Sequence, residues 1–187
     1  MVTGDFEKVL ELVKRYHELN PVGTLGLLAY AYALANQYDE ALNVLIAARE
    51  SEPDNWWIPI VSGLLDMRSG DYKKAIVAIE KYGELRDIPS DLNPWRGYLY
   101  AMSGEKDRAM EILESYKKAN EKKSFPSYFI AYTYLGLGDY DEALTWLEKS
   151  YEDRDSWFPY INSFDYWEPL RSEPRFKALL KKMNLPE

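Results

Sequence analysis

The sequence predicts an all-α protein, built as a right-handed superhelical solenoid of antiparallel helix pairs. Three observations support this fold class. One short phrase recurs along the chain, apolar residues flank each copy at helical spacing, and a glycine or asparagine separates the two halves of each unit. We therefore expect about four full repeats, preceded by a half-repeat and followed by a C-terminal capping helix.

The recurring phrase sets the length of the unit. Its copies read NQYDEALNVL, GDYKKAIVAI, GEKDRAMEIL and GDYDEALTWL. The alanines that they share lie 34 residues apart each time, at Ala41, Ala75, Ala109 and Ala143. Equal spacing without an insertion indicates one structural unit repeated in tandem. The predicted repeats are 22–55, 56–89, 90–123 and 124–157, in a single domain that covers 1–187.

The first full unit shows why each repeat should form two helices. TLGLLAYAYALA carries apolar residues at the spacing of one helical face. Asn36 interrupts it, and the other copies have at this place a glycine, which tolerates the left-handed turn that ends a helix. Ala41 and Leu45 share a face of the second helix, and Pro53 ends that helix. Because alanine is small, its place in the phrase suits a close approach of two helices.

This pattern resembles the tetratricopeptide repeat family over about residues 22–157. The resemblance implies a helix–turn–helix unit and a concave wall formed by the first helix of each unit. It also implies a role in binding other proteins. The matching positions of the first unit are Leu28, Ala29, Tyr32, Ala41, Leu45, Ala48 and Pro53.

Both ends of the array need a cap, because a repeat stack exposes an apolar face at each end. At the N-terminus, 1–21 is predicted to hold one helix, at about 5–19, without a partner helix. Either the chain is a piece of a longer protein or this helix is itself the cap. At the C-terminus, the extension 158–187 is predicted to end in a capping helix, with Ser172 as N-cap and Pro174 in the first turn. Its apolar stripe is Phe176, Leu179, Leu180 and Met183.

Composition argues against several classes of function. The net charge of −8 disfavours nucleic-acid partners, and the one basic cluster, at 117–123, is interpreted as a solvated helix end. Without cysteine and with only His17, zinc-type sites are not expected. Most acidic clusters recur at the repeat turns, where helix N-termini favour negative charge. We expect a non-enzyme without a cofactor or membrane insertion, in the cytoplasm.

Aromatic residues are the unusual feature, with 16 Tyr and 6 Trp. Those on the expected concave wall would form an apolar patch larger than soluble monomers normally expose. Tyr and Trp are also common binding hot spots. The sequence therefore predicts a scaffold for protein–protein interaction, whose groove binds an apolar or amphipathic peptide segment. The predicted partner-binding residues are Tyr30, Trp57, Ile60, Leu64, Trp95, Tyr98, Phe125, Tyr128 and Tyr132.

Other interpretations of the aromatic wall stay open. A second copy of the chain could cover it, in a homo-oligomerisation or regulatory module excised from a larger multidomain protein. The chain's own aromatic tail, 156–167, could fold back over it, or the side chains could pack against each other as core. The wall could also hold a small apolar or sugar-like ligand, as a sensor would.

Overall fold

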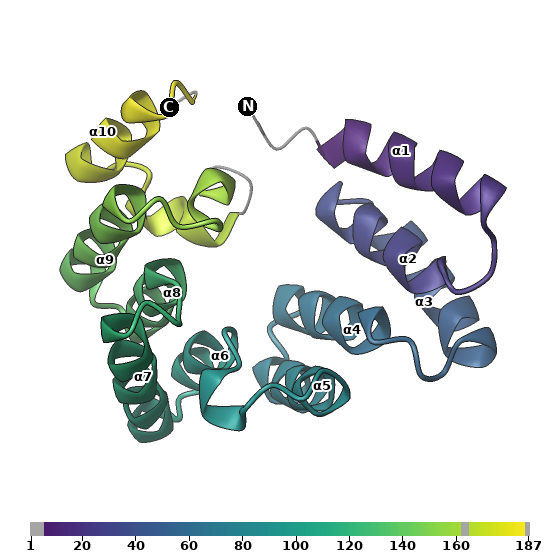
Figure 1. The fold of residues 1–187 in the computed structure, drawn as a ribbon, viewed down its shortest axis with the longest axis horizontal. Helices are drawn as coiled ribbons and strands as arrows, with labels where there is room; N and C mark the ends of the chain where they lie inside the picture. Colours follow the sequence, from purple (N-terminus) through teal and green to yellow (C-terminus); the bar gives the residue numbers. More distant parts are fainter. Residues whose placement is uncertain (1–5, 162–164, 186–187) are drawn as a thin grey trace. The chain divides into compact units, whose positions relative to one another are not determined.

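The structure is a computed structural model that describes residues 6–161 and 165–185. The described residues form α-helices and short 3₁₀ helices, and consecutive α-helices pack in pairs, which confirms the predicted fold class (Figure 1). The chain divides into two compact units between Asn93 and Pro94. Each unit is described on its own, so the single domain over 1–187 and the handedness of the superhelix stay predictions.

The N-terminal unit contains five α-helices. The pairs α2/α3 and α4/α5 are the expected hairpins, and α1 packs against α2 while α4 packs against α2 and α3 (Figure 1). The elements are α1 (Phe6–Leu19), α2 (Leu25–Leu34), α3 (Tyr38–Ser51), α4 (Trp57–Arg68), α5 (Tyr72–Leu85) and the 3₁₀ helix η1 (Ser90–Leu92).

The C-terminal unit contains the other five α-helices. The hairpins are α6/α7 and α8/α9; α8 also packs against α6 and α7, and α10 packs against α9. The elements are α6 (Arg96–Met102), α7 (Lys106–Glu121), α8 (Ser127–Leu137), α9 (Tyr140–Glu152), η2 (Phe158–Tyr160), η3 (Asp165–Leu170) and α10 (Pro174–Lys182). Helix α6 is short because η1 and Pro94 precede it, and the residue before a proline disfavours the helical conformation.

The turns inside the hairpins match the prediction from the repeated phrase. Gly70, Gly104 and Gly138 all have positive φ, between 76° and 88°, and Asn36 takes the same conformation at 59°. Glycine adopts this region without steric cost, and asparagine tolerates it better than most residues. The first helix of each hairpin therefore ends where the phrase begins.

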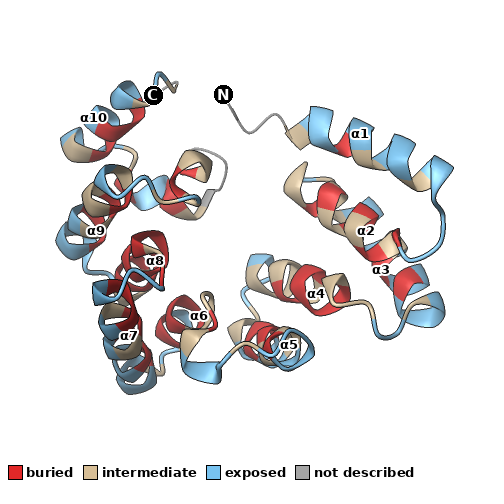
Figure 2. Ribbon diagram, viewed as in Figure 1, coloured by how far each residue is buried: buried red, intermediate tan, exposed pale blue. Residues whose placement is uncertain are grey.

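The shared alanines lie where the two helices of a hairpin meet. Ala41, Ala75, Ala109 and Ala143 each have an exposed fraction of 0%. In the N-terminal unit, Ala29, Ala48 and Val61 belong to one buried cluster that joins α2, α3 and α4. Figure 2 shows the buried residues following one face of most helices, whereas in α8 they extend around the helix. The core of the C-terminal unit is therefore centred on α8.

The end helices agree with the prediction in position and differ in one detail. Helix α1 covers most of the expected 5–19, and in α10 Phe176, Leu179 and Leu180 are buried as expected. Ser172 as N-cap is wrong: Glu173 precedes the helix in an extended conformation and makes no side-chain capping bond. Pro174 occupies the first turn and, because a residue before proline favours extended backbone, it places the start of the helix after Glu173.

Arg175 ties α10 to α9. Its Nε and Nη2 donate to Oε1 and Oε2 of Glu148 at 2.9 and 2.7 Å, and this bidentate bond lowers the pKa of the Glu148 carboxyl. Within the part of the chain that the structure describes, no helix is both long and apolar enough to cross a bilayer.

Candidate functional site

The nine predicted partner-binding residues fall into two groups, one in each unit. Tyr30, Trp57, Ile60 and Leu64 lie in the N-terminal unit, on α2 and α4. The other five lie in the C-terminal unit, on or just before α6 and α8: Trp95, Tyr98, Phe125, Tyr128 and Tyr132. The two groups have different surroundings, and those surroundings decide which residues a partner could reach.

In the N-terminal unit, four half-buried aromatic side chains form a contiguous cluster, which we call the Trp56–Trp57 cluster. The rings of Trp56 and Trp57 stack with centroids 4.1 Å apart, and Tyr30 lies 4.7 Å from Trp57. Tyr82 of α5 lies 6.1 Å from Trp56, and the Arg86 guanidinium sits 4.7 Å from the Trp56 centroid. Three helices therefore supply one aromatic surface.

Local contacts place the two tryptophans. Asn55 accepts a hydrogen bond from the Trp57 backbone N–H through Oδ1, and its Nδ2 donates to Glu52 and to the carbonyl of Gly23. Gly26 gives α4 room to approach α2, because a Cβ added there would lie 2.7 Å from the Cβ of Trp57. The start of α4, and with it the tryptophan pair, is thus fixed against α2.

A shallow cavity of about 510 Å³ adjoins the tryptophan pair. The side chains around it include two carboxylates, those of Glu52 and Asp54. Its lining is Gly23, Ser51, Glu52, Pro53, Asp54, Asn55, Trp56 and Trp57. The surface therefore combines flat apolar rings with acidic groups at one margin.

The two other predicted residues of this unit differ in exposure. Leu64 is half-buried, whereas Ile60 is only 6% exposed and belongs to the core. Ile60 is therefore not accessible to a partner in this structure. Trp56, Tyr82 and Arg86 were not among the predicted residues, although the adjacent pair Trp56–Trp57 was visible in the sequence.

In the C-terminal unit, the chain's own tail covers the predicted wall. Trp167 of η3 donates its indole N–H to the Tyr128 hydroxyl at 2.9 Å, and the hydroxyls of Tyr128 and Tyr166 lie 2.9 Å apart. Tyr132 stacks on Tyr98, with centroids 3.9 Å apart, and contacts Tyr166 on the tail at 4.4 Å. Tyr128, Tyr132 and Trp167 are fully buried as a result.

The tail alternative therefore describes this unit, apart from residues 162–164, which lie outside the described residues. Tyr98, Tyr128 and Tyr132 are buried, so in this conformation they offer no surface to a partner. Phe125 is also buried and stacks on Tyr116 at 4.2 Å. Trp95 is half-buried, with Phe129 at 5.8 Å and Trp157 at 6.2 Å.

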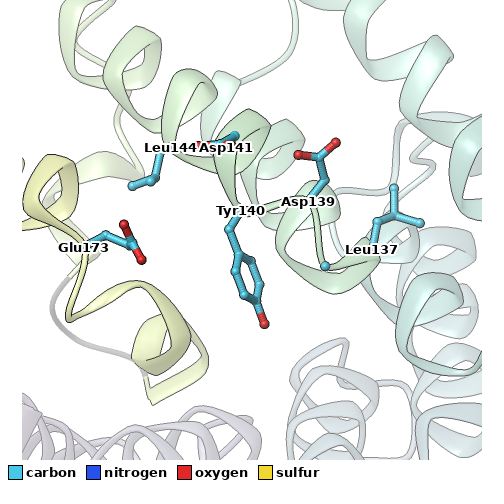
Figure 3. A pocket seen from close by; sticks show the side chains of 7 residues that line it. Leu137, Asp139, Tyr140, Asp141, Leu144 and Glu173 are labelled. Carbon is cyan, nitrogen blue, oxygen red and sulfur yellow. The ribbon is translucent and has the colours of Figure 1, made fainter.

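A second cavity, of about 680 Å³, lies between the α8–α9 turn and the start of α10. Figure 3 shows Glu173 reaching it from the segment before α10, while its other labelled residues come from α8 and α9. The acids here have structural partners: Asp139 accepts from the Glu142 backbone N–H, and Asp141 lies 3.8 Å from Arg175. We assign this cavity no ligand, because an acidic cluster with structural partners does not by itself indicate one.

Residues that could carry chemistry are occupied in packing. His17 hydrogen-bonds Thr24 at 2.6 Å, which joins the end of α1 to the start of α2. Lys117, from the basic cluster near the end of α7, lies 5.3 Å from the Tyr134 ring and 3.1 Å from Glu114. Among residues 6–161 and 165–185, no three His, Asp or Glu side chains are grouped to hold a metal ion.

Comparisons with known proteins add two family matches. The family described as Tetratricopeptide repeat matches residues 22–45, which cover α2 and the first half of α3. The family described as Anaphase-promoting complex, cyclosome, subunit 3 matches residues 68–150, from the end of α4 through most of α9. No curated protein and no solved structure matched the chain in these comparisons.

Proposed function

The chain contains tetratricopeptide repeats over residues 22–45 and 68–150, and from this we propose that its N-terminal unit binds an apolar or amphipathic peptide segment of another protein. Repeats of this family generally mediate protein–protein interactions, and such arrays are typically non-catalytic scaffolds. The second matched family is named for a subunit of a multi-subunit complex, which supports a role in binding proteins.

The Trp56–Trp57 cluster is the observation that carries the proposal. Its rings stack on one another and yet remain half-buried. Tryptophan and tyrosine supply large, rigid contact areas, and a partner that covers them gains apolar burial at low entropic cost. By contrast, the wall of the C-terminal unit already has an occupant, its own tail.

The charges around the cluster indicate which peptides fit best. Glu52 and Asp54 line the cavity beside the tryptophans, and the whole chain carries a net charge of −8. Opposite charges at the rim of an interface raise association rates and favour one class of partner over others. We therefore expect the bound segment to carry apolar anchor residues with Lys or Arg beside them.

A peptide selection tests the proposal directly. A phage-displayed library of random peptides, each about 16 residues long, is selected on the wild-type chain, and enriched peptides are synthesised for calorimetry. The expected consensus contains apolar anchors with adjacent basic residues. Binding should weaken roughly tenfold or more in Trp57→Ala, because hot-spot truncation costs at least ~1.4 kcal/mol.

The matched control is Val77→Ala, which truncates an exposed apolar residue of α5 outside the cluster. This variant should bind the selected peptides as the wild type does, and circular dichroism should show both variants folded. The proposal is wrong if no peptide is enriched, or if the enriched peptides bind Trp57→Ala with unchanged affinity. The homo-oligomerisation and ligand-sensor alternatives stay predictions, and neither is needed to account for the cluster.

A further inference from the structure

Helix α1 has an apolar face that the rest of the described chain leaves exposed. The exposed fractions are 41% for Val9, 63% for Leu12, 50% for Tyr16 and 74% for Leu19. The opposite side of the helix is occupied, because Leu10 is buried in a cluster with residues of α2. Four large exposed apolar side chains on one helix form the kind of contiguous patch that marks an interaction surface.

The repeat itself indicates what this face is built to contact. The phrase GDFEKVLELV is a degenerate copy of the repeated phrase, in which Val9 takes the place of Ala41. In this register Tyr16 takes the place of Ala48, and both alanines of α3 are fully buried in the α2/α3 hairpin. The exposed face of α1 therefore corresponds to the face on which a hairpin seats an antiparallel helix.

The apolar face has a spacing that is the same in both directions. From Val9 the next members follow after 3, 4 and 3 residues, at Leu12, Tyr16 and Leu19. An antiparallel copy of the helix presents the same spacing, so Val9 meets Leu19 of the copy and Leu12 meets its Tyr16. A two-fold interface requires this self-complementarity, because each contact must occur twice. The 3–4 spacing is also that of the apolar seam of a pair of packed helices.

The charges along the open edge of the face are complementary to themselves as well. The exposed residues Lys8, Glu11, Arg15 and Glu18 alternate in sign along the helix. In an antiparallel copy the order of signs is reversed. Lys8 then lies near Glu18 of the second copy, and Glu11 lies near its Arg15, each offset by about half a turn. Opposite charges at such flanking positions set partner choice and orientation in helix pairs.

We propose that α1 is a self-association surface, on which a second copy of this chain docks its own α1 in antiparallel orientation. The surface is separate from the Trp56–Trp57 cluster, and the inference does not rest on the proposed function. A contact made by one helix from each copy is small, so the dimer should be weak and its population should depend on concentration. The occupant is a second copy rather than an unrelated helix because both the spacing and the charges of α1 complement themselves.

Sedimentation equilibrium of the purified chain tests the proposal. The weight-average mass should rise from 21.9 kDa toward twice that value as the concentration increases from about 10 µM to about 1 mM. Leu12→Gln should remain at the monomer mass throughout, because it places a polar group in the middle of the contact. Val77→Gln, which changes an exposed apolar residue of α5, should dimerise as the wild type does. A wild-type mass that stays at 21.9 kDa overturns the proposal, and so does a Leu12→Gln variant that dimerises normally.

A charge exchange tests the antiparallel orientation. Arg15→Glu should raise the dimer dissociation constant several-fold, because it brings two like charges together at each Glu11. The double variant Glu11→Arg with Arg15→Glu should restore the wild-type constant, because the opposite pairs form again with their signs exchanged. If the double variant dimerises no better than Arg15→Glu alone, the two residues are not opposed and the antiparallel arrangement is wrong.

Discussion

Trp167 donates its indole N–H to the hydroxyl of Tyr128 across 2.9 Å, and the two residues are 39 positions apart in the chain. The Tyr128 hydroxyl also lies 2.9 Å from that of Tyr166, so one oxygen of α8 links both aromatic residues of η3. A buried hydroxyl without a partner is costly, and this arrangement satisfies Tyr128 and Trp167 together. The tail is therefore held on α8 by hydrogen bonds as well as by ring packing.

Replacing Tyr128 with phenylalanine should destabilise the C-terminal unit at neutral pH. The ring is kept, but the buried indole N–H of Trp167 loses its acceptor, which costs about 1–3 kcal/mol. Urea unfolding at pH 7 measures this cost. Tyr140→Phe is the control, because Tyr140 is 44% exposed and its loss should change stability by less than about 0.5 kcal/mol. Equal midpoints for the two variants would show that the hydrogen bond contributes nothing.

The same residue should make stability depend on alkaline pH. Burial raises the pKa of the Tyr128 hydroxyl above its ordinary value of 10.0, so the folded chain keeps this proton to higher pH than the unfolded chain does. The stabilisation is complete below pH 10.0 and is lost as the pH rises above that value, by up to about 1.4 kcal/mol per pH unit.

The free energies of unfolding of wild type and Tyr128→Phe, measured at several pH values from about 9 to about 11, reveal this contribution. The wild type should lose stability more steeply than Tyr128→Phe, so the gap between the two should narrow. Tyr140→Phe should follow the wild type. A constant gap between wild type and Tyr128→Phe would mean that Tyr128 ionises alike in the folded and unfolded chains.

Gly26→Ala should disturb the Trp56–Trp57 cluster. An added Cβ would lie 2.7 Å from the Cβ of Trp57, so α2 and α4 must separate, at a cost of about 1–3 kcal/mol. Gly63→Ala is a milder comparison, because its Cβ would meet the flexible end of the Ile79 side chain at 3.1 Å. Thermal unfolding together with tryptophan fluorescence should show a larger drop in Tm and a changed emission spectrum for Gly26→Ala. A smaller effect in Gly26→Ala than in Gly63→Ala would contradict this account of the packing.

Ala41→Leu should destabilise the α2/α3 hairpin. Ala41 is fully buried at the contact between the two helices, and overpacking such a site costs about 1–3 kcal/mol. Ala47→Leu, in the same helix, is the matched control because Ala47 is exposed, and it should change stability by less than about 0.5 kcal/mol. Chemical denaturation of the two variants makes the comparison. If both cost the same, the alanine of the repeated phrase is not at a close helix contact.

The helices and their turns were predictable because local features set them. A positive φ at Gly70, Gly104 and Gly138 follows from a residue type that adopts it without cost, and the 34-residue period places the next helix. The start of α10 was missed by one residue because Ser172 is a good N-cap in isolation, whereas Pro174 imposes an extended Glu173 before the helix. Propensities of this kind depend on a few neighbouring residues, which any sequence displays.

The accessibility of the aromatic wall was not predictable in the same way. Tyr30 and Tyr128 occupy similar places on the first helices of their repeats, yet Tyr30 is half-buried and Tyr128 is fully buried. The difference arises from η3, a segment nearly 40 residues further along the chain, which returns to α8. Helical periodicity shows which residues share a face, and it contains no information on which distant segment covers that face.

The sequence by itself therefore determined the all-helical repeat, its period, its turns and the small residues at its helix contacts, since these depend on residue size and on backbone preferences over a few residues. Only the tertiary structure decided which aromatic side chains remain accessible, where the tail packs and which face of α1 stays exposed. These outcomes depend on contacts between residues that are distant in the chain, and each of them is set by the side chains that compete to bury the same apolar surface.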